Sequence, residues 1–579
     1  MMIKLSVNNR DVEVPEGTSI LDAAGELGIK VPTLCHFKLD DFDIENKAGS
    51  CRVCVVEVEG RPTLAPSCCT PATDGMKVKT NSVRAINARR SMLDLLLSNH
   101  PKDCLTCQRN LDCELQRLAG EMGLHQILFE GEQMEHEVDR ANQSIVRDPN
   151  KCIMCRRCET ACNVMQTVGI LSAVDRGFDA VVMPTSKRSL DDTKCTFCGQ
   201  CVQACPTGAL TAVNRSYDVW RGLNHPAKFK VVQTAPAVRV ALGEAFGMAP
   251  GSVSTGKMVA ALRKLGFDRV FDTDFAADLT IMEETTELIG RLTSGENLPI
   301  LTSCCPGWVK FFEHQFPDLI NIPSTAKSPQ QMFGAIAKTY YAEKAGIAPD
   351  NMLVASVMPC LAKKYEAARD EFAPNGIRDV DIVISTRELA NMIKEAGIQF
   401  MDLDESDFDN PLGESTGAGV IFGATGGVLE AALRTAADWL SDEPIEDVDF
   451  TAVRGLSGIR EATVTVAGKD VRVAIASGLG NARNLLEKIQ KGEAEYEAIE
   501  IMACPGGCIN GGGQPSIKGD TSILEKRRQA LYVIDGDKAI RKSHENPSIQ
   551  KLYKEFLGQP GSERAHKLLH THYTERENA

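Results

Sequence analysis

The sequence predicts a multidomain protein of mixed α+β and α/β class, in which small cysteine-rich modules precede one large α/β domain. The chain has 579 residues, too many for a single core. It has 21 cysteines, most of them before residue 206, where Cys-x-x-Cys groups recur. From about residue 216, short apolar runs alternate with amphipathic segments, which predicts buried strands separated by helices.

Composition limits where this protein works and what it binds. The N-terminus lacks a charged head followed by an apolar run, and no segment is long and apolar enough to span a bilayer. The formal charge of -14 argues against a nucleic-acid partner. In a reducing cytosol, Cys-x-x-Cys groups favour metal ligation over disulfides. We therefore expect a cytoplasmic metalloprotein with no membrane or nucleic-acid partner.

Residues 1–80 are expected to form a β-grasp ferredoxin module that holds one 2Fe–2S cluster. Two alternating strands flank Asn8 and Asn9, a hairpin pattern, and a helix follows with Thr18 as its expected cap. The cysteine spacing resembles the N-terminal ferredoxin domain of complex I and hydrogenase subunits. Cys69 is an alternative to Cys68 as the fourth ligand. The expected ligands are Cys35, Cys51, Cys54 and Cys68.

Residues 81–125 are expected to hold a 4Fe–4S cluster with one histidine ligand. After a helix over 81–98 come His100, Cys104, Cys107 and Cys113. Three cysteines leave a cubane one ligand short. A lone histidine is usually structural, but His100 stands where the fourth ligand is missing. An imidazole carries less negative charge than a thiolate and should raise the reduction potential.

Residues 143–215 contain two four-cysteine runs, the second of which ends in Cys-Pro. This is the pattern of a bacterial ferredoxin with two 4Fe–4S clusters, in which the last cysteine of each run binds the other cluster. Zinc is the alternative, but the doubled run argues against it. One cluster is expected to take Cys152, Cys155, Cys158 and Cys205. The other is expected to take Cys195, Cys198, Cys201 and Cys162.

Residues 216–579 form the expected catalytic domain. Its remaining metal-type cysteines lie in the segments TSCCPGW (302–308), MPCLAKKYE (358–366) and EIMACPGGCINGGGQP (500–515), each just past a predicted strand. Thiolates from distant loops packed among glycine and proline suit a buried iron–sulfur centre. The candidate ligands are Cys305, Cys360, Cys504 and Cys508, which leaves Cys69 and Cys304 as the cysteines without an assignment.

These three segments resemble the signature segments of the iron–iron (FeFe) hydrogenases, and the order of the N-terminal cluster motifs is similar to that of the long clostridial type. The resemblance covers essentially the whole chain. It implies reversible reduction of protons to H2 at an H-cluster, a 4Fe–4S cubane joined to a di-iron unit with carbon monoxide, cyanide and a dithiolate amine. It also implies that Cys305, Cys360, Cys504 and Cys508 hold the cubane and that Cys508 bridges to the di-iron unit.

The resemblance assigns roles to further residues. A proton path is implied through Cys304, Glu284, Ser324, Glu287 and Arg291. Without the resemblance, the helical spacing of its two glutamates and arginine indicates only a solvated charge stripe. Lys363 is placed to donate to a cyanide ligand. Residues that otherwise suit an ordinary core match the di-iron pocket: Ala235, Pro236, Gln330, Met358, Phe422 and Met502. Ala237 lacks a hydroxyl that some relatives have.

The implied electron partner is ferredoxin or flavodoxin. The alternative is the hydrogenase subunit of an NAD(P)-linked or electron-bifurcating complex, in which partner subunits carry the flavin, because this chain has no nucleotide-binding fingerprint. The resemblance also implies dedicated maturase proteins and an anaerobic setting. An electron-transfer subunit or a non-catalytic assembly protein is the less favoured alternative. The C-terminal tail is expected to form helices on the catalytic domain, with structural histidines.

Overall fold

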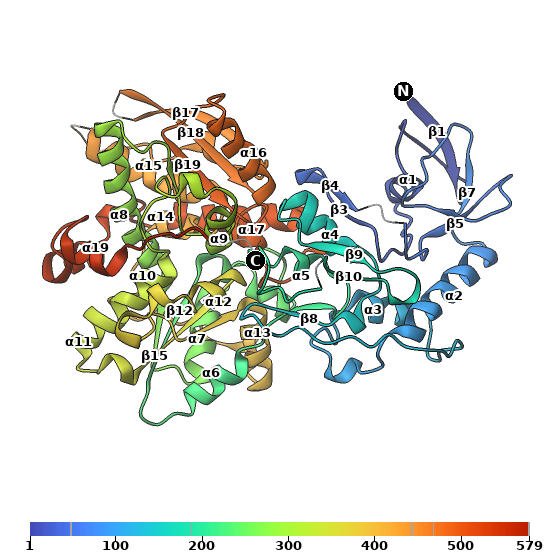
Figure 1. The fold of residues 1–579 in the computed structure, drawn as a ribbon, viewed down its shortest axis with the longest axis horizontal. Helices are drawn as coiled ribbons and strands as arrows, with labels where there is room; N and C mark the ends of the chain where they lie inside the picture. Colours follow the sequence, from blue (N-terminus) through green and yellow to red (C-terminus); the bar gives the residue numbers. More distant parts are fainter. Residues whose placement is uncertain (47–48, 186, 442, 444, 467, 577–579) are drawn as a thin grey trace.

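The computed structural model describes residues 1–46, 49–185, 187–441, 443, 445–466 and 468–576. The N-terminal module lies at one end, the catalytic half at the other, and the cysteine-rich modules between them (Figure 1). The expected multidomain class is confirmed. Among the described helices, none combines the length and the apolar character that crossing a membrane requires.

The N-terminal module is a five-stranded sheet in the order β2-β1-β7-β5-β6. The predicted hairpin is present, because Asn8 and Asn9 both take positive φ angles, 50° and 64°, in the two-residue turn. The strands are β1 (Met2–Val7), β2 (Arg10–Pro15), β5 (Val55–Val58), β6 (Ala65–Pro66) and β7 (Lys77–Lys79).

The first helix, α1 (Ile20–Glu26), begins one residue later than expected. Its N-cap is Ser19, whose Oγ accepts a hydrogen bond from the Asp22 backbone N–H at 3.1 Å. The prediction of Thr18 as the cap is wrong, because the Thr18 hydroxyl turns back and donates to the Pro15 carbonyl at 2.7 Å. Either hydroxyl suits a cap chemically, so the sequence alone did not separate them.

The cysteine-rich modules are built from short elements. The helix expected over 81–98 is present as α2 (Val83–Asn99). Two antiparallel strand pairs lie beside the short helices of the two four-cysteine runs. The other elements are α3 (Glu114–Glu121), α4 (Arg157–Thr160), α5 (Gln200–Ala204), β3 (Phe37–Leu39) with β4 (Ile44–Asn46), β8 (Ile145–Arg147) with β11 (Leu210–Ala212), and β9 (Leu171–Val174) with β10 (Val181–Pro184).

The catalytic half contains two four-stranded sheets. One is entirely parallel, with β13 (Arg269–Asp272), β12 (Phe229–Thr234), β15 (Met352–Met358) and β16 (Ile382–Ser385) in that order. The other has β14 (Ile300–Leu301), β19 (Ala498–Met502), β18 (Lys469–Ser477) and β17 (Ile459–Val466), with only the last pair antiparallel. The short apolar runs predicted as strands in this half include β12, β14, β15 and β19.

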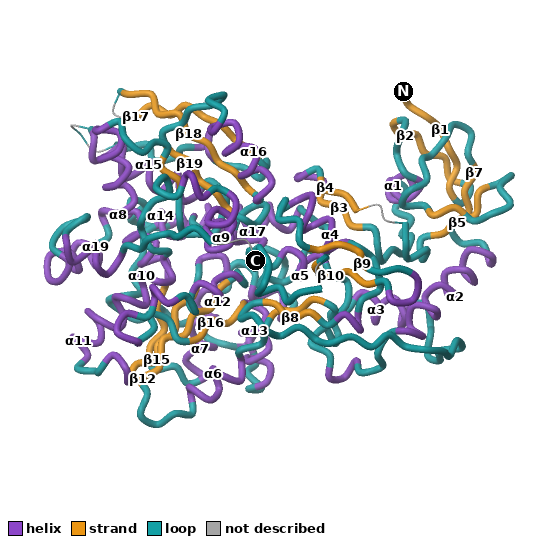
Figure 2. The backbone as a smooth tube through the Cα atoms, in the orientation of Figure 1, coloured by secondary structure: helices purple, strands orange, loops and turns teal. Residues whose placement is uncertain are grey.

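Helices fill the space between these sheets (Figure 2). Those nearest the middle are α8 (Thr273–Ser294), α9 (Pro306–Gln315), α10 (Pro329–Ile336), α12 (Ala362–Glu366), α14 (Gly417–Ile421) and α15 (Gly427–Leu440). The remaining α-helices of this half are α6 (Ser216–Leu223), α7 (Thr255–Leu265), α11 (Ala342–Ala345), α13 (Thr386–Glu395), α16 (Leu479–Gln490) and α17 (Ser522–Asp537). The tail adds α18 (Pro547–Leu552) and α19 (Glu563–Leu569), whose apolar residues join the core around the parallel sheet.

Candidate catalytic site and metal centres

Four cysteines from both sheets of the catalytic half face one another. Cys360 follows β15 of the parallel sheet, whereas Cys504 follows β19 of the mixed sheet and Cys305 caps α9. Burial raises the pKa of Cys504, and the charges of Cys360, Cys305 and Cys508 raise it further. Four such adjacent cysteines can become thiolates together only where a cation compensates their negative charge. The donor set therefore fits an iron–sulfur cubane.

Glycines let the loop that carries the last two cysteines pack closely against its neighbours. A Cβ on Gly512 would lie 2.8 Å from the Gly199 Cα, in the second four-cysteine run. A Cβ on Gly507, where φ is +95°, would lie 2.6 Å from the Thr425 nitrogen. The catalytic cysteine loop and the ferredoxin-like module are thus in direct backbone contact.

Lys363 lies beside Cys304, the cysteine of this domain that has no assigned cluster. Its Nζ donates to the Cys304 carbonyl at 3.0 Å and to both carboxylate oxygens of Glu366, at 3.1 and 3.0 Å. Burial lowers the pKa of Lys363, but the charges of Glu366 and Cys304 outweigh it and raise that pKa above its ordinary value. Sequence reasoning missed Glu366, although its position three residues after Lys363 on α12 signals an ion pair.

The predicted di-iron pocket residues are buried around this site. Phe422 and Met502 share one apolar cluster with Cys304 and Cys508, whereas Ala235 and Met358 belong to the neighbouring core. Pro236 follows β12, where that strand ends. The Gln330 amide nitrogen donates to the Lys363 carbonyl at 3.2 Å and to Glu366 at 2.9 Å. Its Oε1 is buried with no hydrogen-bond partner among the described residues, which leaves an acceptor free for a group that donates a hydrogen bond there.

The predicted proton path is partly joined by direct hydrogen bonds. Ser324 Oγ donates to Glu287 Oε2 at 2.7 Å, and Arg291 donates to Glu287 Oε1 at 2.6 Å. Both oxygens of Glu284 are buried with no hydrogen-bond partner among the described residues. Burial, with the charge of Glu287, raises the pKa of Glu284 to about 8. Burial also raises the pKa of Cys304, as does the charge of Glu284.

The C-terminal tail closes over this path, which sequence reasoning did not anticipate. The Tyr573 hydroxyl donates to the Ser324 carbonyl at 2.6 Å. The Thr325 backbone N–H donates to Glu287 at 3.1 Å, and the Thr325 hydroxyl meets His570 Nδ1 at 2.7 Å. The other His570 nitrogen lies 2.9 Å from Glu283. No signal in the tail itself reveals these contacts, since they join residues far apart in the sequence.

The N-terminal cysteines also gather. The sulfurs of Cys54 and Cys68 are 3.5 Å apart, and the Cys35 backbone N–H donates to the Cys51 sulfur at 3.4 Å. The contact with Cys68 lowers the pKa of Cys54 to about 6. Cys68 is fully buried, whereas Cys69 is exposed. These positions favour Cys68 over Cys69 as a ligand.

The surroundings of His100 favour a neutral imidazole, which can bind a metal, over a protonated one. Its Nδ1 is buried and has no hydrogen-bond partner among the described residues, and burial lowers its pKa to about 4. A neutral imidazole with a free nitrogen is the form that binds metal. Of the accompanying cysteines, Cys104 is exposed while Cys107 and Cys113 are half-buried, and the Cys113 sulfur lies 3.6 Å from the Pro206 carbonyl.

The two four-cysteine runs exchange their last members. One cavity is lined by the sulfur-bearing residues Cys152, Cys155, Cys158 and Cys205. In the other group, burial raises the pKa of Cys201, and the charges of Cys198, Cys195 and Cys162 add to it. The last cysteine of each run therefore lies with the first three of the other. Each group offers the four thiols that a cubane needs.

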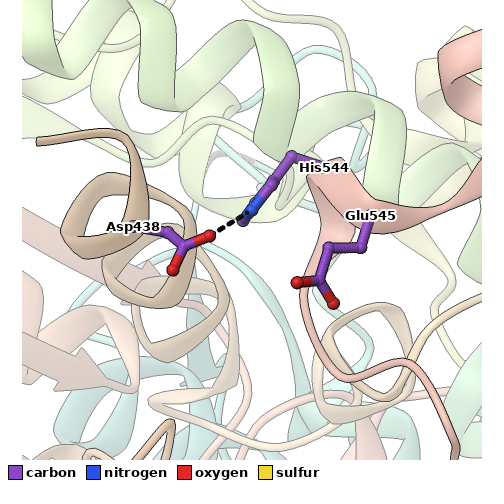
Figure 3. A group of neighbouring side chains, drawn as sticks. All are labelled: Asp438, His544 and Glu545. Atoms are coloured by element: carbon purple, nitrogen blue, oxygen red, sulfur yellow. Dashed lines mark hydrogen bonds and ion pairs between the residues drawn. The ribbon is translucent and has the colours of Figure 1, made fainter. Parts of the chain in front are cut away.

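One further cluster of potential ligands lies away from these cysteines, at Asp438, His544 and Glu545 (Figure 3). Asp438 Oδ2 contacts His544 Nε2 at 2.8 Å. The ammonium of Lys542 sits 2.8 Å from the other Asp438 oxygen and 3.5 Å from Glu545. The Lys542 ammonium therefore already pairs with both carboxylates of this cluster. His544 also contacts the Thr435 hydroxyl at 3.2 Å, and the structural role expected for the tail histidines stays a prediction.

Families of known proteins match successive segments of this chain. Residues 228–512 match the family described as the iron only hydrogenase large subunit, C-terminal domain, and residues 521–576 match the iron hydrogenase small subunit. Residues 1–83 match a 2Fe-2S iron-sulfur cluster binding domain, residues 89–127 the NADH-ubiquinone oxidoreductase-G iron-sulfur binding region, and residues 189–211 a 4Fe-4S binding domain.

Two relatives match over essentially the whole chain, and a solved structure matches over part of it. The chain is 59% identical to the NADP-reducing hydrogenase subunit HndD of Solidesulfovibrio fructosivorans, covering 100% of this chain and 99% of that one. It is 40% identical to iron hydrogenase 1 of Clostridium pasteurianum, covering 99% and 100%. An apo FeFe hydrogenase structure from Chlamydomonas reinhardtii covers 63% of this chain and 99% of its own, with 46% identity and a TM-score of 0.57. The chain belongs to the iron-only (FeFe) hydrogenase family.

Proposed function

We propose that this hydrogenase interconverts protons and H2 in the anaerobic cytoplasm as the hydrogen-handling subunit of a larger NAD(P)-linked complex. The observation that carries the hydrogenase chemistry is the meeting of two buried thiols, Cys360 and Cys504, and two half-buried ones, Cys305 and Cys508, beside Cys304 and Lys363. The full-length identity of 59% to the subunit of an NADP-reducing hydrogenase supports the complex. We assign the domains as 1–80, 81–125, 143–215 and 216–579.

The cubane of the H-cluster would be held by Cys305, Cys360, Cys504 and Cys508, with Cys508 next to the di-iron unit. When bound, that group supplies the hydrogen-activating redox chemistry. Lys363 stays an ammonium at the site because Glu366 and the Cys304 carbonyl accept hydrogen bonds from it. A buried cation of this kind suits an anionic ligand such as cyanide. Phe422 and Met502 exclude water from the same space.

Protons would travel from Cys304 through Glu284 and Ser324 to Glu287 and Arg291. A pKa near 8 keeps the Glu284 carboxyl protonated at neutral pH, so it can donate a proton as well as accept one. Ser324 and Glu287 already share a hydrogen bond, and Arg291 leads to the surface. A water molecule on either side of Glu284 would complete the path, since its oxygens lack partners among the described residues.

Electrons would travel through one 2Fe–2S and three accessory 4Fe–4S clusters. The group of Cys162, Cys195, Cys198 and Cys201 is the last step before the H-cluster, because the charge of Cys198 reaches Cys504 and Gly307 packs against Cys198. The His100 and 2Fe–2S groups are the outer ends. Their electrons would come from flavin- and NAD(P)-binding partner subunits.

A free-standing enzyme that uses ferredoxin or flavodoxin is the second candidate, supported by the 40% identity to the clostridial iron hydrogenase across the full chain. Purification from the native cell separates the two. Flavoprotein subunits that remain with this chain support the complex, whereas a single chain active with reduced ferredoxin supports the second candidate.

The test of hydrogenase function is infrared spectroscopy on protein made together with its maturase proteins. Carbon monoxide and cyanide stretches, together with H2 evolution from a chemical reductant, are expected. Protein produced without maturases should show neither. Matured protein with full iron content but without diatomic stretches would contradict the assignment of the H-cluster.

A further inference from the structure

Arg147 lies in the wall of the cavity that Cys152, Cys155, Cys158 and Cys205 line. It ends strand β8, where it pairs with Leu210 of β11, and this register holds its side chain at the cavity. The residue is buried, with 6% of its surface exposed. A guanidinium in this place is fixed next to four thiols.

The charge of Arg147 is poorly neutralised by protein. Its Nε and Nη1 are buried and have no hydrogen-bond partner among the described residues. The carboxylate of Asp139 is 4.0 Å from Nε, and its oxygens already accept from the Ser189 hydroxyl and the Leu190 backbone N–H, both at 2.9 Å. A buried cation without a close anion costs free energy, so an anionic group at the cavity is the missing partner. A cubane bound by four thiolates is such a group.

Neighbouring arginines differ in this respect. Arg156 lines the same cavity, but its side chain is half-exposed and both of its contacts with Glu159 are 2.7 Å. Arg157 is buried, but it binds Glu114 through two hydrogen bonds of 2.8 and 3.1 Å. Of these three arginines, Arg147 is the one without a closely bound carboxylate.

This cavity is also where the two outer routes meet. The Asn46 amide nitrogen donates to the Cys35 carbonyl at 2.6 Å and to the Cys155 carbonyl at 2.9 Å, which links the 2Fe–2S group to this one. From the His100 module, Arg109 donates to the Cys205 carbonyl at 3.3 Å, and the Glu114 backbone N–H donates to the Pro206 carbonyl at 2.9 Å. The centre in this cavity is therefore a junction.

We propose that Arg147 raises the reduction potential of the cluster at this junction. The cluster can then accept electrons from either outer centre. The inference rests on the cluster assignment under the proposed function. The step is a one-electron reduction of the cubane by an outer cluster, with no proton transferred. Reduction adds one negative charge, and a fixed positive charge nearby stabilises the reduced state.

The test is a redox titration of full-length holoprotein followed by electron paramagnetic resonance. Arg147→Gln should lower the equilibrium constant for reduction of one 4Fe–4S cluster by about tenfold. The midpoint potential of its signal then falls by about 59 mV for one electron. Arg147→Lys keeps the charge and should restore most of the shift. Arg156→Gln is the matched control, since it removes a charge from the same cavity that is exposed and therefore screened by water, and it should leave every signal in place.

The possible outcomes distinguish a failure of this inference from a failure of the proposed function. Wild-type protein without the expected 4Fe–4S signals would overturn the cluster assignment. Signals present but unmoved in Arg147→Gln would overturn the tuning role alone, as would an equal shift in Arg156→Gln. If Arg147→Gln loses the cluster, Asp139→Asn carries the test. Removing that carboxylate should raise the same potential, and an unchanged value would overturn the proposal.

Discussion

Ser324 and Glu287 are joined by a hydrogen bond of 2.7 Å from the serine hydroxyl to the carboxylate, whereas Glu284, one helical turn earlier, has no partner among the described residues. The outer part of the proton path is thus prearranged, and its inner part depends on one buried carboxyl group. This asymmetry makes Glu284 and Cys304 the residues at which the path is most easily broken.

Replacing Cys304 by serine should leave the metal site intact and stop proton delivery. We expect the infrared bands of matured Cys304→Ser protein to match wild type while H2 turnover falls about 100-fold or more, since serine is a far weaker acid than cysteine. Cys69→Ser is the matched control, because that cysteine is exposed. Normal turnover in Cys304→Ser would contradict its role in the path.

The buried carboxyl of Glu284 should give the enzyme a dependence on pH. Its pKa is raised to about 8 by burial, against an ordinary value of 4.5. Below pH 8 the group holds its proton and can pass it on, so turnover limited by this path should decline as pH rises above about 8. Glu284→Gln should lower turnover about 100-fold and abolish this decline. A wild-type profile that stays level to pH 10 would rule the assignment out.

The same shift predicts an effect on stability. A carboxyl whose pKa is higher in the folded state binds its proton more tightly there, so the fold loses stability as pH rises from about 4.5 to about 8. Glu284→Gln lacks this loss. Its apparent melting temperature should match wild type near pH 4.5 and exceed it at pH 8 to 9. The reverse order at pH 9 would show that the carboxylate is stabilised by a partner.

The sequence predicted those parts of the site that depend on short stretches of the chain. Cysteine spacing, strand ends and the helical repeat of Glu284, Glu287 and Arg291 are all short-range features, and the predicted strands and helix are present. Contacts between distant segments could not be read in this way. Tyr573 reaches Ser324 across 249 residues, and Asn46 reaches Cys155 across 109. Such pairs depend on the packing of whole modules.

The choice between two adjacent cysteines in the N-terminal module can be tested directly. Cys68 lies 3.5 Å from the Cys54 sulfur in a buried site, whereas Cys69 is exposed. Cys68→Ser should lose or broaden the 2Fe–2S signal in electron paramagnetic resonance and lower the bound iron. Cys69→Ser should keep both unchanged. The opposite result would make Cys69 the ligand.

Glu366 provides the last prediction, on a residue that the sequence pattern did not single out. It holds the Lys363 ammonium at 3.0 Å and also accepts from Gln330 and from the Ser328 hydroxyl, so it fixes the direction in which Lys363 points. In Glu366→Gln the ammonium loses its carboxylate, which should lower the pKa of Lys363 because burial is then opposed by fewer negative charges.

The measurement is infrared spectroscopy of matured Glu366→Gln protein. A change in Lys363 should shift the cyanide bands more than the carbon monoxide bands, because an ammonium donates to the nitrogen of cyanide, and turnover should fall by about tenfold. Glu371→Gln is the control, since that nearby carboxylate pairs with Arg369 and not with Lys363. Cyanide bands identical to wild type would show that Lys363 keeps its position without Glu366, and its placement would then have to come from the Cys304 carbonyl alone.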